Sequence, residues 1–224
     1  MTNQAIVQLS NVRFGKKKLE MENSTNRRNW QVLLLGGASG VGKTSVSYRL
    51  AQYFGVNLTE VDDFQVVLEK LTTSEQLPLL HFWRTHWNEY SRWTEEAQLA
   101  HFVRVCTEVF AQALEAVIAN HLESKVPLVL EGDFIIPALA TLPTYNGIPA
   151  DGLVKALFLY EAEEAQIARN YQARENREQL GRARSSWLFS QWLRQEYTQQ
   201  NIPALAVRPW ETILERAITT ISTF

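Results

Sequence analysis

The chain has almost no cysteine, since Cys106 is the only one among its 224 residues. One thiol excludes an internal disulfide framework, and its place in an apolar helical stripe predicts a buried thiol rather than a nucleophile. No apolar run reaches the length of a membrane span, and the first residues lack the apolar core of a signal peptide. We therefore expect a cytoplasmic protein with no membrane partner.

The chain also lacks a strong excess of either charge. Its 22 Lys and Arg against 24 Asp and Glu leave a net charge of −2, so a nucleic-acid partner is not expected. His81 and His86 have no metal-ligand spacing with the single cysteine, so zinc is not expected either. A composition of 46% hydrophobic and 21% charged residues is ordinary for a globular domain of this size.

One glycine-rich segment carries most of the functional information. Residues 37–44 read Gly-Ala-Ser-Gly-Val-Gly-Lys-Thr, a complete G-x-x-x-x-G-K-[ST] phosphate-binding loop, the Walker A motif. Its glycines let successive backbone N–H groups turn toward a phosphate, Lys43 adds a positive charge, and the Thr44 hydroxyl can bind Mg²⁺. An apolar run at 32–35 precedes the loop and helical spacing follows it, so a helix N-terminus points at the anion. The alternative is a glycine-rich turn with a chance lysine.

We expect this loop to bind a nucleoside triphosphate together with Mg²⁺, with Thr44 as the metal ligand. ATP is the expected nucleotide, because Arg208-Pro209-Trp210 lies where related folds hold a purine. The residues expected to contact the nucleotide are Gly37, Ala38, Ser39, Gly40, Val41, Gly42, Lys43, Thr44 and Ser45.

Short apolar runs alternate with helical segments along the rest of the chain. Strands are predicted at 31–36, 57–61, 127–130, 153–160 and 203–207. Helices are predicted at 42–54, 94–123, 161–180, 186–200 and from 210 onward. This alternation predicts an α/β P-loop NTPase fold, in which about five parallel strands have helices on both faces. Residues 1–30 read as a peripheral N-terminal extension that precedes the P-loop domain at 31–224.

Acidic side chains follow two of the predicted strands, at the sheet edge where ligands bind in parallel sheets. Asp62 and Asp63 follow the second strand, where one of them could accept a proton from an acceptor hydroxyl or hold the water shell of a metal. Capping of the next helix is the alternative. Glu131 follows the third strand and could organise metal-bound water or the acceptor, with Asp133 as a second acid on this loop. A solvated loop acid is the alternative there.

Basic side chains follow the fourth strand. Five arginines lie between 161 and 184, and an exposed helix with many ion pairs is one explanation for them. A lid at about 161–185 that neutralises phosphoryl charge is the other, with Arg169, Arg174 and Arg177 as the expected catalytic set. In the aromatic stretch at 81–87, Arg84 could receive an anionic acceptor, although such aromatics are more often part of a core.

These motifs resemble those of P-loop kinases of the nucleoside-monophosphate-kinase type, and more closely those of the 2-phosphoglycerate kinase family. The resemblance rests on residues 36–44, on Asp62 with the short amphipathic stretch to Leu68, and on Glu131-Gly132-Asp133-Phe134-Ile135-Ile136-Pro137. It covers about residues 30–220. Uridine-kinase-like enzymes also carry D-D-F or D-S-F after the second strand, so Asp62-Asp63-Phe64 fits them too.

The resemblance implies an enzyme that transfers the γ-phosphoryl group of ATP to a hydroxyl of a small, anionic metabolite. In that interpretation Lys43 and Asp62 are catalytic, and Asp63, Arg84 and Glu131 bind the acceptor. A uridine-kinase-like nucleoside kinase is one alternative. A second, from another class, is a nucleotide-dependent switch or binding protein that hydrolyses ATP slowly.

Overall fold

A computed structural model describes residues 28–223 of the chain. Its main sheet has five parallel strands in the order β2-β3-β1-β6-β7. The bounds of these strands are Val32–Gly36 for β1, Asn57–Glu60 for β2, Leu128–Gly132 for β3, Val154–Tyr160 for β6 and Ala204–Ala206 for β7. The predicted α/β fold with about five parallel strands is therefore confirmed. Of the N-terminal extension predicted at residues 1–30, residues 1–27 lie outside the described part of the chain.

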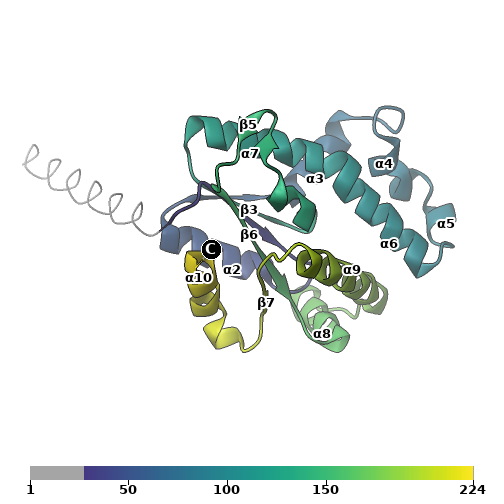
Figure 1. Cartoon of the computed structure of the whole chain (residues 1–224). Helices are drawn as coiled ribbons and strands as arrows, with labels where there is room; N and C mark the ends of the chain where they lie inside the picture. The colour runs from purple at the N-terminus through teal and green to yellow at the C-terminus, as the bar shows by residue number, and fades with distance from the viewer. Residues whose placement is uncertain (1–27, 224) are drawn as a thin grey trace, which may run out of the picture.

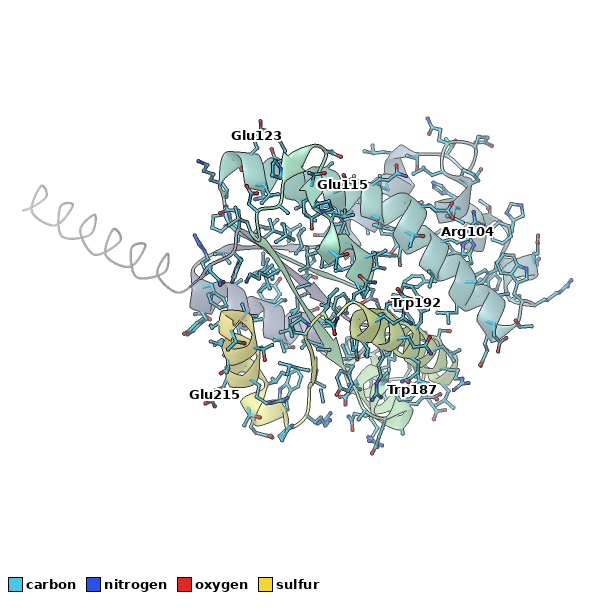
Figure 2. All side chains as sticks on the ribbon, viewed as in Figure 1. Arg104, Glu115, Glu123, Trp187, Trp192 and Glu215 are labelled. Carbon is cyan, nitrogen blue, oxygen red and sulfur yellow. The ribbon has the colours of Figure 1, made fainter. Side chains whose placement is uncertain are left out.

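Helices cover both faces of this sheet (Figure 1). The helices α2 and α10 lie on one face, while α7 and α9 lie on the other. Figure 2 labels Trp187 and Trp192 on α9, and both side chains pack against the core. The bounds of these helices are Lys43–Phe54 for α2, Ala111–Ser124 for α7, Leu180–Gln199 for α9 and Ile213–Thr223 for α10.

The central strand β1 shows why this sequence forms a buried sheet. Every residue of its Val-Leu-Leu-Leu-Gly run is buried, and β3 and β6 pair with it on either side. Strands covered on both faces are apolar along their whole length rather than alternating. The register places Gly36 opposite Gly132 and Phe158, so the carboxyl ends of three neighbouring strands meet at one edge.

The long amphipathic helix predicted at 94–123 is present with one irregularity. It runs as α6 (Glu95–Arg104), a π-helical stretch (Val105–Phe110) and α7, without a break in the chain direction. Thr94 caps its start by accepting a hydrogen bond from the Ala97 amide at 3.3 Å. Cys106 lies on the π-helical stretch and is fully buried, as predicted, and burial raises the pKa of its thiol well above the usual range.

Sequence periodicity misplaced or missed several smaller elements. The helices predicted at 161–180 and 186–200 are α8 (Glu164–Glu175) and α9, so the break between them falls at 176–179. Asn176 ends α8 in the left-handed region at φ 54°, which asparagine adopts more readily than most residues. The polar and aromatic stretch at 64–93, whose composition predicts short helices, contains most of α3 (Asp62–Leu71) together with α4 (Pro78–Thr85) and α5 (Trp87–Tyr90), whereas a hairpin of β4 (Thr144–Tyr145) with β5 (Ile148–Pro149) was not predicted. Between residues 28 and 223, no helix has both the length and the apolar character to cross a membrane.

Candidate active site

The loop between β1 and α2 turns sharply, and two of its glycines make the turn possible. Gly37 has φ +143°, and a Cβ there would lie 2.3 Å from the Leu159 carbonyl oxygen. Gly42 has φ +95°, and a Cβ there would lie 2.8 Å from the Trp210 ring. Larger residues would meet both a strained backbone and a clash. The glycines of the motif therefore allow the backbone to form the loop on which a phosphate would sit.

Lys43 is the charged centre of the site. Its side chain is 5% exposed, and its ammonium donates to Asp133 at 2.5 Å and to the Ala38 carbonyl at 3.1 Å. Glu131 lies 3.9 Å from the same ammonium. Burial lowers the pKa of Lys43, but Asp133 and Glu131 outweigh burial, so the pKa rises above its ordinary value. Lys43 therefore stays charged, with Asp133 at the place where an anion would bind.

Glu131 and Thr44 form the second part of the site. The Thr44 hydroxyl donates to Glu131 at 3.1 Å, which joins the start of α2 to the end of β3. Glu131 is 4% exposed, and burial raises its pKa to about 7 even though Lys43 opposes the rise. A pKa this high means that burial disfavours the charged carboxylate more than the nearby Lys43 stabilises it.

Mg²⁺ fits this arrangement. Thr44, Glu131 and Asp133 place oxygen atoms beside the loop, and a divalent cation would stabilise the ionised form of Glu131, whose pKa is raised first by burial and then by nearby carboxylates. In the described part of the chain, no group of three or more His, Cys, Asp or Glu side chains is arranged to hold a metal alone.

Asp62 begins α3 directly beyond β2. It is exposed to the cleft that it lines, so water reaches its carboxyl. Partial burial raises its pKa to about 6, Asp133 adds to the rise, and Lys43 opposes it. A carboxyl with a pKa near neutral can both accept and release a proton at physiological pH. Asp63, its neighbour, is exposed and lines none of the cavities around the loop.

These groups face one cleft of about 870 Å³, which we call the phosphate cleft. Seven of the nine residues predicted to bind the nucleotide line it, namely Ser39, Gly40, Val41, Gly42, Lys43, Thr44 and Ser45. Gly37 and Ala38 lie behind them, and Ala38 supports Lys43 through its carbonyl. The other lining residues are Asp62, Glu131, Asp133, Glu161, Asn170, Ala173, Arg174, Arg208, Trp210 and Glu211.

The helix α8 contacts the loop through a residue that sequence reasoning missed. Asn170 donates to the Gly40 carbonyl at 2.8 Å and lies 3.4 Å from Glu161, whose buried carboxylate pairs with Arg208 at 3.4 Å. Asn170 follows Arg169 directly in the sequence, but no sequence pattern marks an asparagine among arginines as a functional residue. The polar contact between α8 and the loop is therefore made by an amide rather than a guanidinium group.

The predicted arginines occupy different places. Arg174 lines the phosphate cleft, whereas Arg169 bonds to Gln166 and Arg177 is exposed, and neither of them lines it. One carboxylate, Glu175, contacts three guanidinium groups: Arg174 and Arg182 at 2.8 Å each and Arg177 at 3.8 Å. Hydrogen bonds from Arg174 in particular lower the pKa of Glu175. These three arginines, from the end of α8 to the start of α9, are thus held by a shared acidic partner.

Two smaller cavities adjoin the phosphate cleft, with volumes of about 290 and 200 Å³. Both are lined by Ser39, Tyr90, Phe102, Asp133 and Arg182, and we call the pair the aromatic chamber. Arg84, predicted to bind the acceptor, lines neither cavity. It pairs with Glu69 at 2.7 Å, and its guanidinium carbon lies 4.9 Å from the centre of the Trp83 ring.

The fold and the loop together define a P-loop NTPase of the α/β class. The sequence resembles curated 2-phosphoglycerate kinases. It is 30% identical over 112 residues to the one from Methanothermobacter thermautotrophicus, across 47% of this chain and 36% of that protein. It is 27% identical over 118 residues to the one from Methanococcus maripaludis, across 48% of this chain and 37% of that protein. The chain thus spans little more than a third of the length of these relatives.

The fold also resembles that of a solved P-loop kinase. A sugar kinase from a Janibacter species superposes with a TM-score of 0.52 at 17% identity, over 85% of this chain and 93% of that one. No protein-family model matches the chain. The predicted resemblance to P-loop kinases and to 2-phosphoglycerate kinases is thereby confirmed.

Proposed function

We propose that this protein is a small-molecule kinase that transfers the γ-phosphoryl group of ATP, as its Mg²⁺ complex, to a hydroxyl of a small metabolite. One observation carries the proposal. The phosphate cleft and the aromatic chamber share Ser39 and Asp133, and Asp62 lines both the cleft and the larger cavity of the chamber. A protein that only holds or hydrolyses a nucleotide has no need of a second cavity opening onto the phosphate site. The sequence similarity to 2-phosphoglycerate kinases supports the same reaction class.

Each residue of the site has a separate role in the proposed phosphoryl transfer. Lys43 and the loop amides hold the β- and γ-phosphates, and Thr44 with Glu131 would hold Mg²⁺, which neutralises charge on the phosphates. The hydroxyl oxygen of the acceptor attacks the γ-phosphorus, and the bond to the β,γ-bridging oxygen breaks to release ADP. Asp62 takes the hydroxyl proton, for which a pKa of about 6 is well placed. Arg174 neutralises charge on the phosphoryl group in transfer.

Asp133 links nucleotide binding to this arrangement. Its carboxylate pairs with the Lys43 ammonium at 2.5 Å, so a γ-phosphate that binds Lys43 would replace this carboxylate as its partner. The displaced carboxylate remains at the border of the phosphate cleft and the aromatic chamber, where it can join the water shell of Mg²⁺. Binding of ATP is therefore an exchange of one anion for another.

A nucleotide-dependent switch is the second candidate, and one observation favours it. The helix α3, which Asp62 begins, carries exposed Val66, Val67 and Leu71, with Leu71 75% exposed. An apolar face that moves with the nucleotide state could contact a partner protein. A switch of this kind would hydrolyse ATP slowly whatever metabolite is present.

Acceptor-stimulated ADP release distinguishes the two candidates. The purified protein is given ATP and Mg²⁺ with a panel of hydroxyl compounds that includes 2-phosphoglycerate, and stimulation is confirmed by isolating the phosphorylated product. We expect at least one compound to raise ADP release about 100-fold or more, and Asp62→Asn to abolish the stimulation. Slow ADP release that no compound changes would favour the switch.

A further inference from the structure

The position of the aromatic chamber fits an acceptor site. It meets the phosphate cleft at Ser39 and Asp133, and Asp62 stands at the boundary. A hydroxyl presented from the chamber can therefore reach both the γ-phosphate and the proposed base. The chamber is built between two parts of the fold, because α3 to α6 supply one wall and α8 and α9 supply the other (Figure 1).

Six Phe, Trp and Tyr side chains form part of the chamber walls, beside aliphatic, polar and charged ones. Trp83 and Phe134 line the larger cavity, and Tyr90 and Phe102 line both. Ring packing holds these walls in place, since Phe102 lies 5.6 Å from Phe134 and 4.8 Å from Phe189 between ring centres. The side-chain amides of Gln65 and Gln98 are uncharged polar groups on the same walls. Such walls suit a flat or apolar surface that also carries a few hydrogen-bonding groups.

The charges of the chamber are unfavourable to an anion. Among the residues that the structure describes, Arg182 is the one Lys or Arg that lines it, and Glu175 already pairs with that guanidinium at 2.8 Å. Three carboxylates line the same space: Asp133 pairs with Lys43 at 2.5 Å, Glu95 pairs with Arg184 at 3.1 Å, and Asp62 is the third. Burial lowers the pKa of His101, the other titratable base on the wall, so it adds no positive charge at neutral pH.

A phosphorylated acceptor would bring a charge of about −1.5 to −2 into this space. Sites that recognise phosphate monoesters supply guanidinium or ammonium groups with free hydrogen-bond donors, and like charges at close range oppose binding. Arg84, the cation expected from the sequence to receive an anion, is held by Glu69 and lines neither cavity. The cations of the site are instead on the nucleotide side, where Lys43, Arg174 and Arg208 line the phosphate cleft.

We propose that the acceptor is an uncharged hydroxyl compound with a planar or apolar face, which lies against Trp83 and Tyr90 while its hydroxyl meets Asp62. The proposal rests on the proposed phosphotransferase function and names its substrate class. Nucleosides have this chemistry, because a flat uncharged base is joined to a sugar that carries hydroxyls. The carboxylates of the chamber would accept hydrogen bonds from those hydroxyls.

The test compares three classes of acceptor on the wild-type protein with ATP and Mg²⁺. The probes are uncharged compounds that carry a flat nucleobase ring (here called ring-bearing), such as uridine and adenosine, uncharged compounds without such a flat ring (here called ringless), such as ribose and glycerol, and phosphomonoesters such as ribose 5-phosphate. We expect the best ring-bearing compound to exceed every member of the other two classes at least 10-fold in kcat/KM. If a phosphomonoester or a ringless compound is the best acceptor, the substrate class is wrong and the kinase assignment stands. If no compound stimulates ADP release, the kinase assignment itself fails, and the substrate class with it.

Variants of the wall locate the acceptor. Trp83→Ala is expected to raise the KM of the best ring-bearing acceptor about 10-fold, because stacking on one ring is lost, while the KM of ATP stays within two-fold. Trp83→Phe keeps a ring and is expected to recover most of the loss, which separates stacking from misfolding. Trp87→Ala is the matched control, since that tryptophan is exposed on α5 and lines neither cavity. Equal acceptor KM values for Trp83→Ala and Trp87→Ala would overturn the proposal.

Discussion

The phosphate cleft and the aromatic chamber share a border but are built in different ways. The cleft takes seven of its 17 lining residues from one continuous stretch of chain, residues 39–45, and its chemistry is that of charge. The chamber takes its lining mostly from α3, α4, α5, α6, α8 and α9, and aromatic side chains stand beside aliphatic and polar ones on its walls. A site made by one segment can be recognised in a sequence, whereas a site assembled from many segments becomes visible only in the fold.

The two regions also differ in how many of their residues can be substituted. The loop backbone of the cleft must fit a polyphosphate, which is the same in every nucleoside triphosphate, and its two crowded glycines leave little room for substitution. The chamber wall depends on side chains from helices that the sheet does not constrain, so its specificity can change without loss of the phosphate site. The predictions below test the two regions separately.

Removal of the Lys43 charge is the most damaging single change that we expect. Lys43→Met should lower acceptor-stimulated turnover by about 10³-fold, because Lys43 is the one buried Lys or Arg on the phosphate cleft among residues 28–223. Lys70→Met is the matched control, since that lysine is exposed at the end of α3. Steady-state ADP release with saturating acceptor is the measurement, and comparable rates for the two variants would contradict the assignment of Lys43.

Asp62→Asn should lower stimulated turnover by about 10²-fold or more, because the acceptor hydroxyl loses its base. In the wild-type protein only the ionised carboxyl can take the proton, so kcat/KM should rise with pH through about 6 and level off above it. The variant should lack this rise. A pH profile of kcat/KM for both proteins is the measurement, and an unchanged rise in the variant would assign it to another group.

Arg174 and Arg177 offer a finer comparison at the rim of the phosphate cleft. Arg174→Gln should lower kcat about 10-fold, in line with the loss of one charge-assisted hydrogen bond to the phosphoryl group. Arg177→Gln should lower it less than about three-fold, because its side chain is exposed and lines no part of the cleft. The reverse order in kcat would show that the lid closes with Arg177, rather than Arg174, against the nucleotide.

The smallest expected effect is on stability and concerns Glu131. Its pKa in the fold is about 7 against an ordinary value of 4.5, so the fold favours the protonated carboxyl, and stability falls as pH rises through about 7. Without nucleotide or metal, Glu131→Gln should therefore raise Tm by about 3 °C at pH 8 and leave it nearly unchanged at pH 5. Glu123→Gln, an exposed change on α7, is the control. Equal shifts at both pH values would remove the electrostatic explanation.

Most of the sheet and the phosphate loop could be predicted, because buried parallel strands and a complete motif are local signals. The bounds of the five strands were predicted to within a few residues, and the Walker A motif at 37–44 predicted the strand before it and the helix after it. Glu131 and Asp133 were expected near the loop because they follow β3, and parallel strands bring their carboxyl ends to one edge. These features could be predicted because they depend on residues that are adjacent in the sequence.

The rest depended on side-chain geometry that no local pattern expresses. Nothing in the sequence distinguishes Arg174, which lines the phosphate cleft, from Arg169 and Arg177, which do not. Arg182 looks like one more residue of a charged helix, yet it faces the aromatic chamber because α9 begins at Leu180, several residues earlier than periodicity suggested. The aromatic stretch at 81–87 was open to interpretation as core, and the fold places Trp83 on a cavity wall and leaves Trp87 exposed.

Glu175 stands next to three guanidinium groups, of which Arg174 lines the phosphate cleft and Arg182 lines the aromatic chamber, so its loss would change the charge beside both. A neutral residue at that position would free Arg174, Arg177 and Arg182 together, so that the rim would attract anions of every kind. Inorganic phosphate and stray nucleotides would then compete with the correct ligand, most strongly at low salt, where screening is weakest. One carboxylate thus limits the binding of unrelated anions here, because it pairs with the cations around it.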